Sequence, residues 1–104
     1  MSLNKQNIND TKNYYNTNGV AVLRNVLDKK WLEPMRRAID NVLQNPGPAS
    51  IEYTPSNTKG RYYGDFFIWR KNETFKNFAF KSVLPEIAAK ISESKKINFF
   101  YDQL

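Results

Sequence analysis

Ile97-Asn98-Phe99-Phe100-Tyr101-Asp102-Gln103-Leu104 is the stretch of this chain on which the interpretation of the rest depends. It is rich in aromatic residues, contains no glycine or proline, and places alternate side chains on opposite sides. These features predict a β-strand with both faces occupied. Such a strand needs a neighbour and cover, yet neither a turn nor a hairpin partner follows Leu104. We therefore expect a strand that has been separated from its sheet.

The composition predicts one small domain over residues 1–104. Of the 104 residues, 40% are hydrophobic and 14% aromatic, which is enough for a modest core. No apolar run approaches the ~20 residues that span a bilayer, and the first residues are too polar for a signal peptide. We expect no membrane span and a cytoplasmic location.

The chain contains neither cysteine nor histidine. This excludes disulfides, thiolate metal sites, the usual ligands of a catalytic transition metal and a histidine base. The net charge is +6, but the basic residues are scattered singly or in pairs. This spacing favours a solvated surface, with the binding of an acidic ligand as the alternative. The aromatic segment at residues 60–70 fits the pattern of an RNA-recognition strand in neither register, so nucleic acid is not an expected partner.

The N-terminal third is predicted to contain an arm, a helix and a strand. Residues 1–9 are polar and are expected to form a loose arm. A short helix is predicted over residues 11–18, with Tyr14 and Tyr15 on its buried side and Gly19 as its left-handed stop. The β-branched run at residues 20–26 predicts a strand.

The clearest helix follows Asp28, which is a suitable N-cap. Its apolar residues recur at spacings of three and four, which predicts a scaffold helix packed on a sheet. These positions are Trp31, Leu32, Met35, Ala38, Ile39, Val42 and Leu43. A long loop is predicted over residues 46–60, with residues 51–53 extended, and loops of this length often act as lids.

The C-terminal half is predicted to hold two short helices before the final strand. Residues 60–70 predict a turn and an extended segment, because two glycines and an aspartate interrupt the aromatic run. Asn72 is the predicted cap of a short helix, and Ser82 or Leu84 opens another with Pro85 in its first turn.

Two aspartates are candidates for carboxylate chemistry. Asp65 and Asp102 each lie beside aromatic residues, whose cover could raise the pKa of a carboxyl group. An isolated aspartate more often caps a helix or a turn. We expect the capping role and assign no catalytic residue.

Taken together, these segments resemble the phytanoyl-CoA dioxygenase family of non-haem Fe(II)/2-oxoglutarate-dependent oxygenases. The matching phrases are YNTNGVAVLRNVL (residues 15–27), DKKWLEPMRRAIDNVLQNPGP (28–48), GRYYGDFFIWR (60–70) and SVLPEIAAKISESKKINFFYDQL (82–104). Each phrase is weakly specific by itself. Their order and spacing are similar to the N-terminal part of a bacterial-type member.

The resemblance implies an α+β chain that forms the N-terminal helices and first strands of a double-stranded β-helix, a cupin-like jelly roll. Members of the family bind Fe(II) through a His-x-Asp motif and a distal histidine, bind 2-oxoglutarate, and hydroxylate small or lipid-like substrates. None of these iron ligands is present. The motif is expected shortly after Leu104, so the chain is expected to be truncated before the iron site and inactive alone. The alternative is a non-catalytic remnant that binds a partner through exposed aromatics and a free strand edge.

Four residues are carried over as a candidate lining for substrate or cosubstrate. In a sheet, Tyr101 and Gln103 would share a face that suits the wall of a site, and Gln103 would donate or accept a hydrogen bond there. Phe67 and Trp69 would line the entrance. Because an unpaired strand invites pairing, self-association through the strand edge is also expected.

Overall fold

Helix α2 (Lys29–Gln44) is the longest element of the computed structural model, which describes residues 5–104. The carboxylate of Asp28 accepts a hydrogen bond from the Lys30 N–H at 2.9 Å, which satisfies one of the free amides of the first turn. The apolar spacing buries Ala38 and Val42 on one side of the helix. The predicted cap and helix are both confirmed. The predicted packing of this helix on a sheet is wrong, because its buried side contacts helix α3 (Glu73–Lys81) instead.

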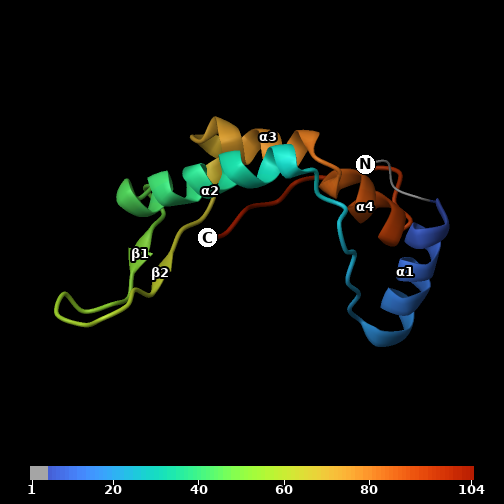
Figure 1. The fold of residues 1–104 in the computed structure, drawn as a ribbon, viewed down its shortest axis with the longest axis horizontal. Helices are drawn as coiled ribbons and strands as arrows, with labels where there is room; N and C mark the ends of the chain where they lie inside the picture. The colour runs from blue at the N-terminus through green and yellow to red at the C-terminus, as the bar shows by residue number, and fades with distance from the viewer. Residues whose placement is uncertain (1–4) are drawn as a thin grey trace.

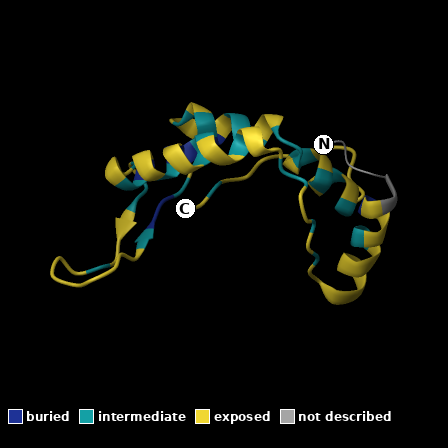
Figure 2. Ribbon diagram, viewed as in Figure 1, coloured by how far each residue is buried: buried dark blue, intermediate teal, exposed yellow. Residues whose placement is uncertain are grey.

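The core lies between α2 and helix α3 (Glu73–Lys81), beside the short 3-10 helix η1 (Ile68–Arg70). The Asn72 side chain accepts a hydrogen bond from the Phe75 N–H at 3.1 Å, so the predicted cap is confirmed. Figure 2 shows how few residues are buried outside this region. The core consists of Ala38, Val42, Ile68 and Phe75, against which Met35, Ile39, Tyr63, Trp69 and Leu104 pack.

Helices α1 (Lys5–Asn18) and α4 (Leu84–Ile91) pack against each other at the other end of the molecule (Figure 1). Lys12 and Glu93 form an ion pair between α1 and the residues after α4. Pro85 lies in the first turn of α4, as predicted. Gly19 ends α1 with a φ of 75°, which confirms the predicted left-handed stop.

Two predictions about the N-terminal segment are wrong. Residues 5–9, expected in a loose arm, belong to α1, while residues 1–4 of that arm lie outside the described part of the chain. Tyr14 and Tyr15, expected to be buried, are 60% and 43% exposed. The buried residue of α1 is Ile8, at 4% exposure. The contact between α1 and α4 therefore buries Ile8 and leaves both tyrosines exposed.

The predicted strand at residues 20–26 is also wrong. The segment is an extended connection between α1 and α2, and it belongs to none of the strands in the described residues. Val20 and Val22 are 63% and 69% exposed. A β-branched run favours extended backbone, but a strand needs a hydrogen-bonded neighbour, and none lies beside this segment.

The sheet of the described residues is an antiparallel pair of β1 (Ile51–Glu52) and β2 (Tyr63–Gly64). Ile51 pairs with Gly64 and Glu52 with Tyr63. The pair extends away from the helices and ends in a loop (Figure 1). This confirms that residues 46–60 are largely a loop with a short extended part.

The final segment, residues 97–104, is extended but is not the regular strand that was predicted. It forms one isolated antiparallel bridge, between Gln103 and Phe66. Phe100 is 78% exposed, so the prediction that both faces of this segment are covered is wrong. In Figure 1 the helices are arranged as an arch, and the final segment lies beneath them on its inner side.

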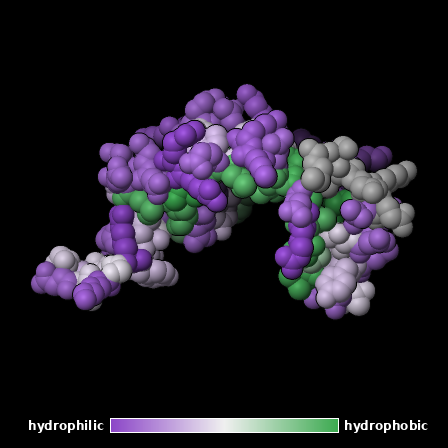
Figure 3. Space-filling view, in the orientation of Figure 1, coloured by the Kyte–Doolittle hydropathy of each residue, from purple (hydrophilic) through white to green (hydrophobic). Residues whose placement is uncertain are grey.

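The described chain is α+β and elongated. Its radius of gyration is 16.4 Å, whereas a compact domain of this length has about 13 Å. Figure 3 shows hydrophobic residues gathered along the inner side of the arch below α2. Within residues 5–104, no helix combines the length and apolar character needed to cross a membrane.

Candidate functional site

The C-terminal segment runs antiparallel to the chain that leads into η1. Leu104 donates a backbone hydrogen bond to Asp65 at 3.0 Å and accepts one from it at 3.1 Å. The Phe67 N–H donates to the Asp102 carbonyl at 3.2 Å. These bonds place Gln103 opposite Phe66, and they join two segments that are far apart in the sequence.

The carboxylate of Asp102 caps the first turn of η1. One oxygen accepts from the Ile68 N–H at 2.6 Å and the other from the Trp69 N–H at 2.8 Å. Both oxygens are therefore used by the first amides of a helical turn, where a negative charge is favourable. The capping role predicted for Asp102 is confirmed.

Asp65 is the most buried side chain among the described residues, at 1% exposure. Its carboxylate accepts hydrogen bonds from the Gly47 N–H at 3.0 Å, the Tyr63 hydroxyl at 2.7 Å and the Phe66 N–H at 2.8 Å. Burial, together with the hydrogen bond to Asp65, raises the pKa of the Tyr63 hydroxyl above its ordinary value. Three donors compensate the buried charge, so the role of Asp65 is to join the loop at Gly47 to β2.

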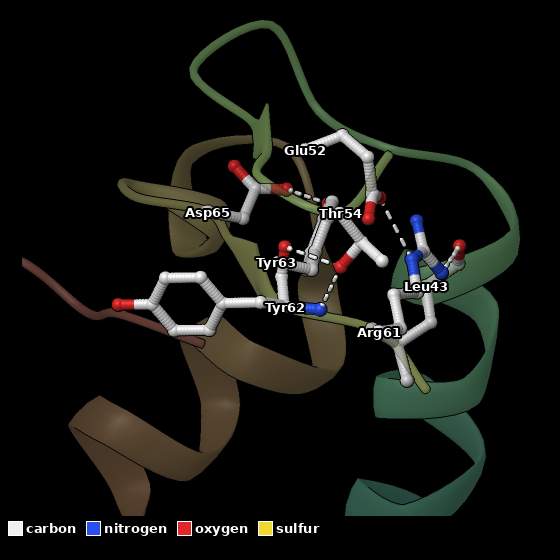
Figure 4. Close-up of polar contacts among 7 residues, drawn as sticks. All are labelled: Leu43, Glu52, Thr54, Arg61, Tyr62, Tyr63 and Asp65. Carbon is white, nitrogen blue, oxygen red and sulfur yellow. Dashed lines mark hydrogen bonds and ion pairs between the residues drawn. The ribbon is translucent and has the colours of Figure 1, made fainter. Parts of the chain in front are cut away.

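Arg61 attaches the β1–β2 pair to the end of α2 (Figure 4). Its guanidinium donates to the Leu43 carbonyl at 2.7 Å and to the Glu52 carboxylate at 2.8 Å. The same group lies 4.6 Å from the centre of the Tyr63 ring. Figure 4 also shows the Tyr62 N–H bonded to the Thr54 hydroxyl, which closes the stem of the loop.

Three of the four predicted lining residues lie together. The rings of Phe67 and Tyr101 have centres 5.7 Å apart, and Tyr101 is 40% exposed. Gln103 is exposed and lies opposite Phe66, the neighbour of Phe67. Phe67, Tyr101 and Gln103 therefore lie close together, in or next to the same short antiparallel pairing.

Trp69 lies in a different aromatic cluster. Its ring packs 5.5 Å from Phe80 and 5.8 Å from Phe99, centre to centre. Its indole N–H is buried without a hydrogen-bond partner among the described residues. Arg70 lies between the two groups, 4.7 Å from the centre of Phe67 and 5.8 Å from that of Trp69.

A pocket that the sequence did not predict lies beside the paired residues 65–67 and 102–104. It measures about 540 Å³ and lies between the end of α2, the loop at residues 45–49 and the stretch at residues 65–72. Of the four predicted lining residues, only Phe67 borders it. Its signals in the sequence are the Asn-Pro-Gly-Pro turn at residues 45–48 and the Arg70-Lys71 pair. Neither signal identifies a pocket until the chain has folded.

Residues 5–104 offer no group of three or more carboxylate, histidine or cysteine side chains that could hold a metal ion. No family model matches this chain, and neither a curated protein nor a solved structure matches it.

Proposed function

We propose that this chain is the N-terminal part of a Fe(II)/2-oxoglutarate-dependent dioxygenase of the phytanoyl-CoA dioxygenase family. The full-length enzyme would hydroxylate a small or lipid-like organic substrate. The observation that supports this proposal best is the antiparallel pairing of residues 65–67 with residues 102–104, with helices packed on one side. Antiparallel pairing of this kind is compatible with the first strands of a cupin-like jelly roll.

The alternation of side chains along the final segment agrees with this proposal. Asp102 and Leu104 turn toward η1 and the core, where Leu104 packs against the buried cluster. Tyr101 and Gln103 are exposed on the other side. This is the arrangement that the wall of a binding site needs, with the amide of Gln103 available to a substrate or cosubstrate.

The residues present do not fit an iron site. The chain has no histidine, and the carboxylates of Asp65 and Asp102 are occupied by amide and hydroxyl donors. We assign no iron ligand to the described residues. The proposal places the His-x-Asp motif in sequence that follows Leu104.

The coding sequence after Leu104 tests the proposal directly. A His-x-Asp triplet within a short distance would support it, and a stop codon would contradict it. As a second test, the 104-residue chain is expected to show no turnover of 2-oxoglutarate. Succinate release above a metal-free control would show that this assignment of the iron ligands is wrong.

A non-catalytic binding module is the second candidate. It is favoured by the large exposed aromatic side chain of Phe100 and by the single pairing partner of the final segment. Such a module would bind a partner strand along residues 97–104. A stop codon after Leu104 would favour this candidate.

A further inference from the structure

The pocket at the end of α2 has the size of a small-molecule site. Its volume of about 540 Å³ falls within the range of about 300–1,000 Å³ that is typical of ligand pockets. Arg70 and Lys71 border it, and both are exposed. Three segments build it, and two of them are joined by the buried Asp65 carboxylate through Gly47 and Phe66.

Most of the pocket wall is apolar. Val42, Pro46, Pro48, Phe66 and Ile68 contribute hydrocarbon surface. Ile68 and Val42 belong to the core, so this part of the wall is held by buried packing. A ligand with an apolar body would bury hydrophobic surface here.

The polar part of the rim is positively charged. Arg70 and Lys71 border the pocket, and neither forms an ion pair with a described residue. The Arg70 guanidinium is stacked over the ring of Phe67, 4.7 Å from its centre. A stacked guanidinium keeps the N–H groups at its edge available, and their fork matches a carboxylate.

Phe67 holds an unusual backbone conformation at this point. Its φ is 56°, in the left-handed region that a bulky side chain rarely adopts. Strained residues of this kind gather at binding sites, and this one carries the ring beneath Arg70. The remaining charge at the pocket is Asp65, whose carboxylate already accepts three hydrogen bonds and is 1% exposed. The rim therefore attracts anions.

We propose that this pocket binds a small organic carboxylate with an apolar body. Arg70 grips the carboxylate, Lys71 adds charge, and the apolar wall holds the body of the ligand. The proposal does not depend on the dioxygenase function, because no iron ligand or 2-oxoglutarate contact enters it.

Titration calorimetry of the 104-residue chain with octanoate tests the proposal. We expect saturable binding of octanoate. Binding of 1-octanol should be weaker because it carries no negative charge, and binding of inorganic phosphate should be weaker because it has no apolar body. Arg70→Gln is expected to weaken octanoate binding about tenfold, the loss typical of one charge-assisted contact. Lys71→Gln should weaken it less.

Lys76→Gln is the matched control, since Lys76 is an exposed residue of α3 that does not border the pocket. It removes the same charge and should leave octanoate affinity unchanged. Equal losses in Arg70→Gln and Lys76→Gln would overturn the proposal in favour of general charge attraction. Binding of 1-octanol as tight as that of octanoate, tighter binding of phosphate, or no binding of octanoate would also overturn it.

Discussion

Leu104 and Asp65 exchange two backbone hydrogen bonds, at 3.0 Å and 3.1 Å. The side chain of the same Asp65 holds the Gly47 N–H and the Tyr63 hydroxyl. One residue thus connects the end of the chain, the loop after α2 and β2. Its side chain joins the loop to β2, and its backbone joins this pair to Leu104.

Asp65→Asn should lower the free energy of unfolding by about 2 kcal/mol, because an amide nitrogen would replace an acceptor that faces buried donors. Urea denaturation followed by far-UV circular dichroism measures this change. Asp40→Asn is the control, since Asp40 is exposed on α2. It should change stability by no more than about 0.5 kcal/mol. Equal effects of the two substitutions would show that the buried carboxylate has no special role.

Gly47→Ala should be destabilising through a steric clash. A Cβ atom at this position would lie 3.0 Å and 3.2 Å from the two carboxylate oxygens of Asp65. Since Asp65 is held by three donors, we expect a cost of about 1–3 kcal/mol in urea denaturation. Gly64→Ala is the matched control, because its Cβ would meet the nearest atom, in Tyr53, at an ordinary 3.5 Å. A smaller loss for Gly47→Ala than for Gly64→Ala would contradict this explanation.

The stability of the chain should fall as the pH rises above about 10. Burial and the bond to Asp65 raise the pKa of Tyr63 above its ordinary value of 10.0, so the folded state retains this proton longer than the unfolded state. The contribution is complete below pH 10 and is lost as the pH passes through the raised pKa. Tyr63→Phe should reduce the slope of unfolding free energy against pH in this range. Tyr62→Phe, which alters a ring that is 69% exposed, should leave the slope as it is.

Asp102→Ala should release the final segment from η1. The carboxylate accepts from the Ile68 and Trp69 amides, and loss of a cap costs about 1 kcal/mol. Hydrogen exchange at these two amides should accelerate about fivefold, as follows from that free energy if they exchange through local opening. Asn98→Ala, at an exposed position of the same segment, should not change their exchange. Unaltered exchange in Asp102→Ala would contradict the capping role.

The helices could be predicted where their signals are local. Asp28 and Asn72 are caps whose bonds stay within three residues, and the apolar spacing of α2 lies within the helix itself. The strand predicted at residues 20–26 failed because strand formation depends on a neighbour that no local pattern reveals. For the same reason the aromatic run at residues 97–104 became an extended segment with one bridge.

The site was predictable only in part. The capping of η1 by Asp102 follows a general preference of aspartate, although its partners lie more than 30 positions earlier in the chain. The pocket needs three separate segments, so neither its volume nor the place of Arg70 on its rim could be derived from spacing. Phe67 and Trp69 were predicted to line one entrance, but η1 starts between them and Trp69 packs against Phe80.

Self-association through residues 97–104 stays a prediction with a structural basis. In an antiparallel ladder, alternate residues direct their N–H and C=O groups to opposite sides. Leu104 and Asp102 bond to the stretch at residues 65–67, so the backbone groups of Gln103 point to the open edge. Phe100, 78% exposed, lies further along the same segment. A second copy could pair there, and light scattering after size exclusion should show dimers that increase with concentration.

Phe100→Lys should abolish these dimers, because a charge on the edge opposes pairing of identical strands. Tyr14→Lys is the matched control, since Tyr14 is an aromatic residue of α1 that is 60% exposed and lies outside the segment. It adds the same charge and should leave the dimers in place. If the charge repelled copies in general, both variants would dissociate equally. A monomeric wild-type chain with cooperative unfolding at all concentrations would show that the final segment is stable without a partner.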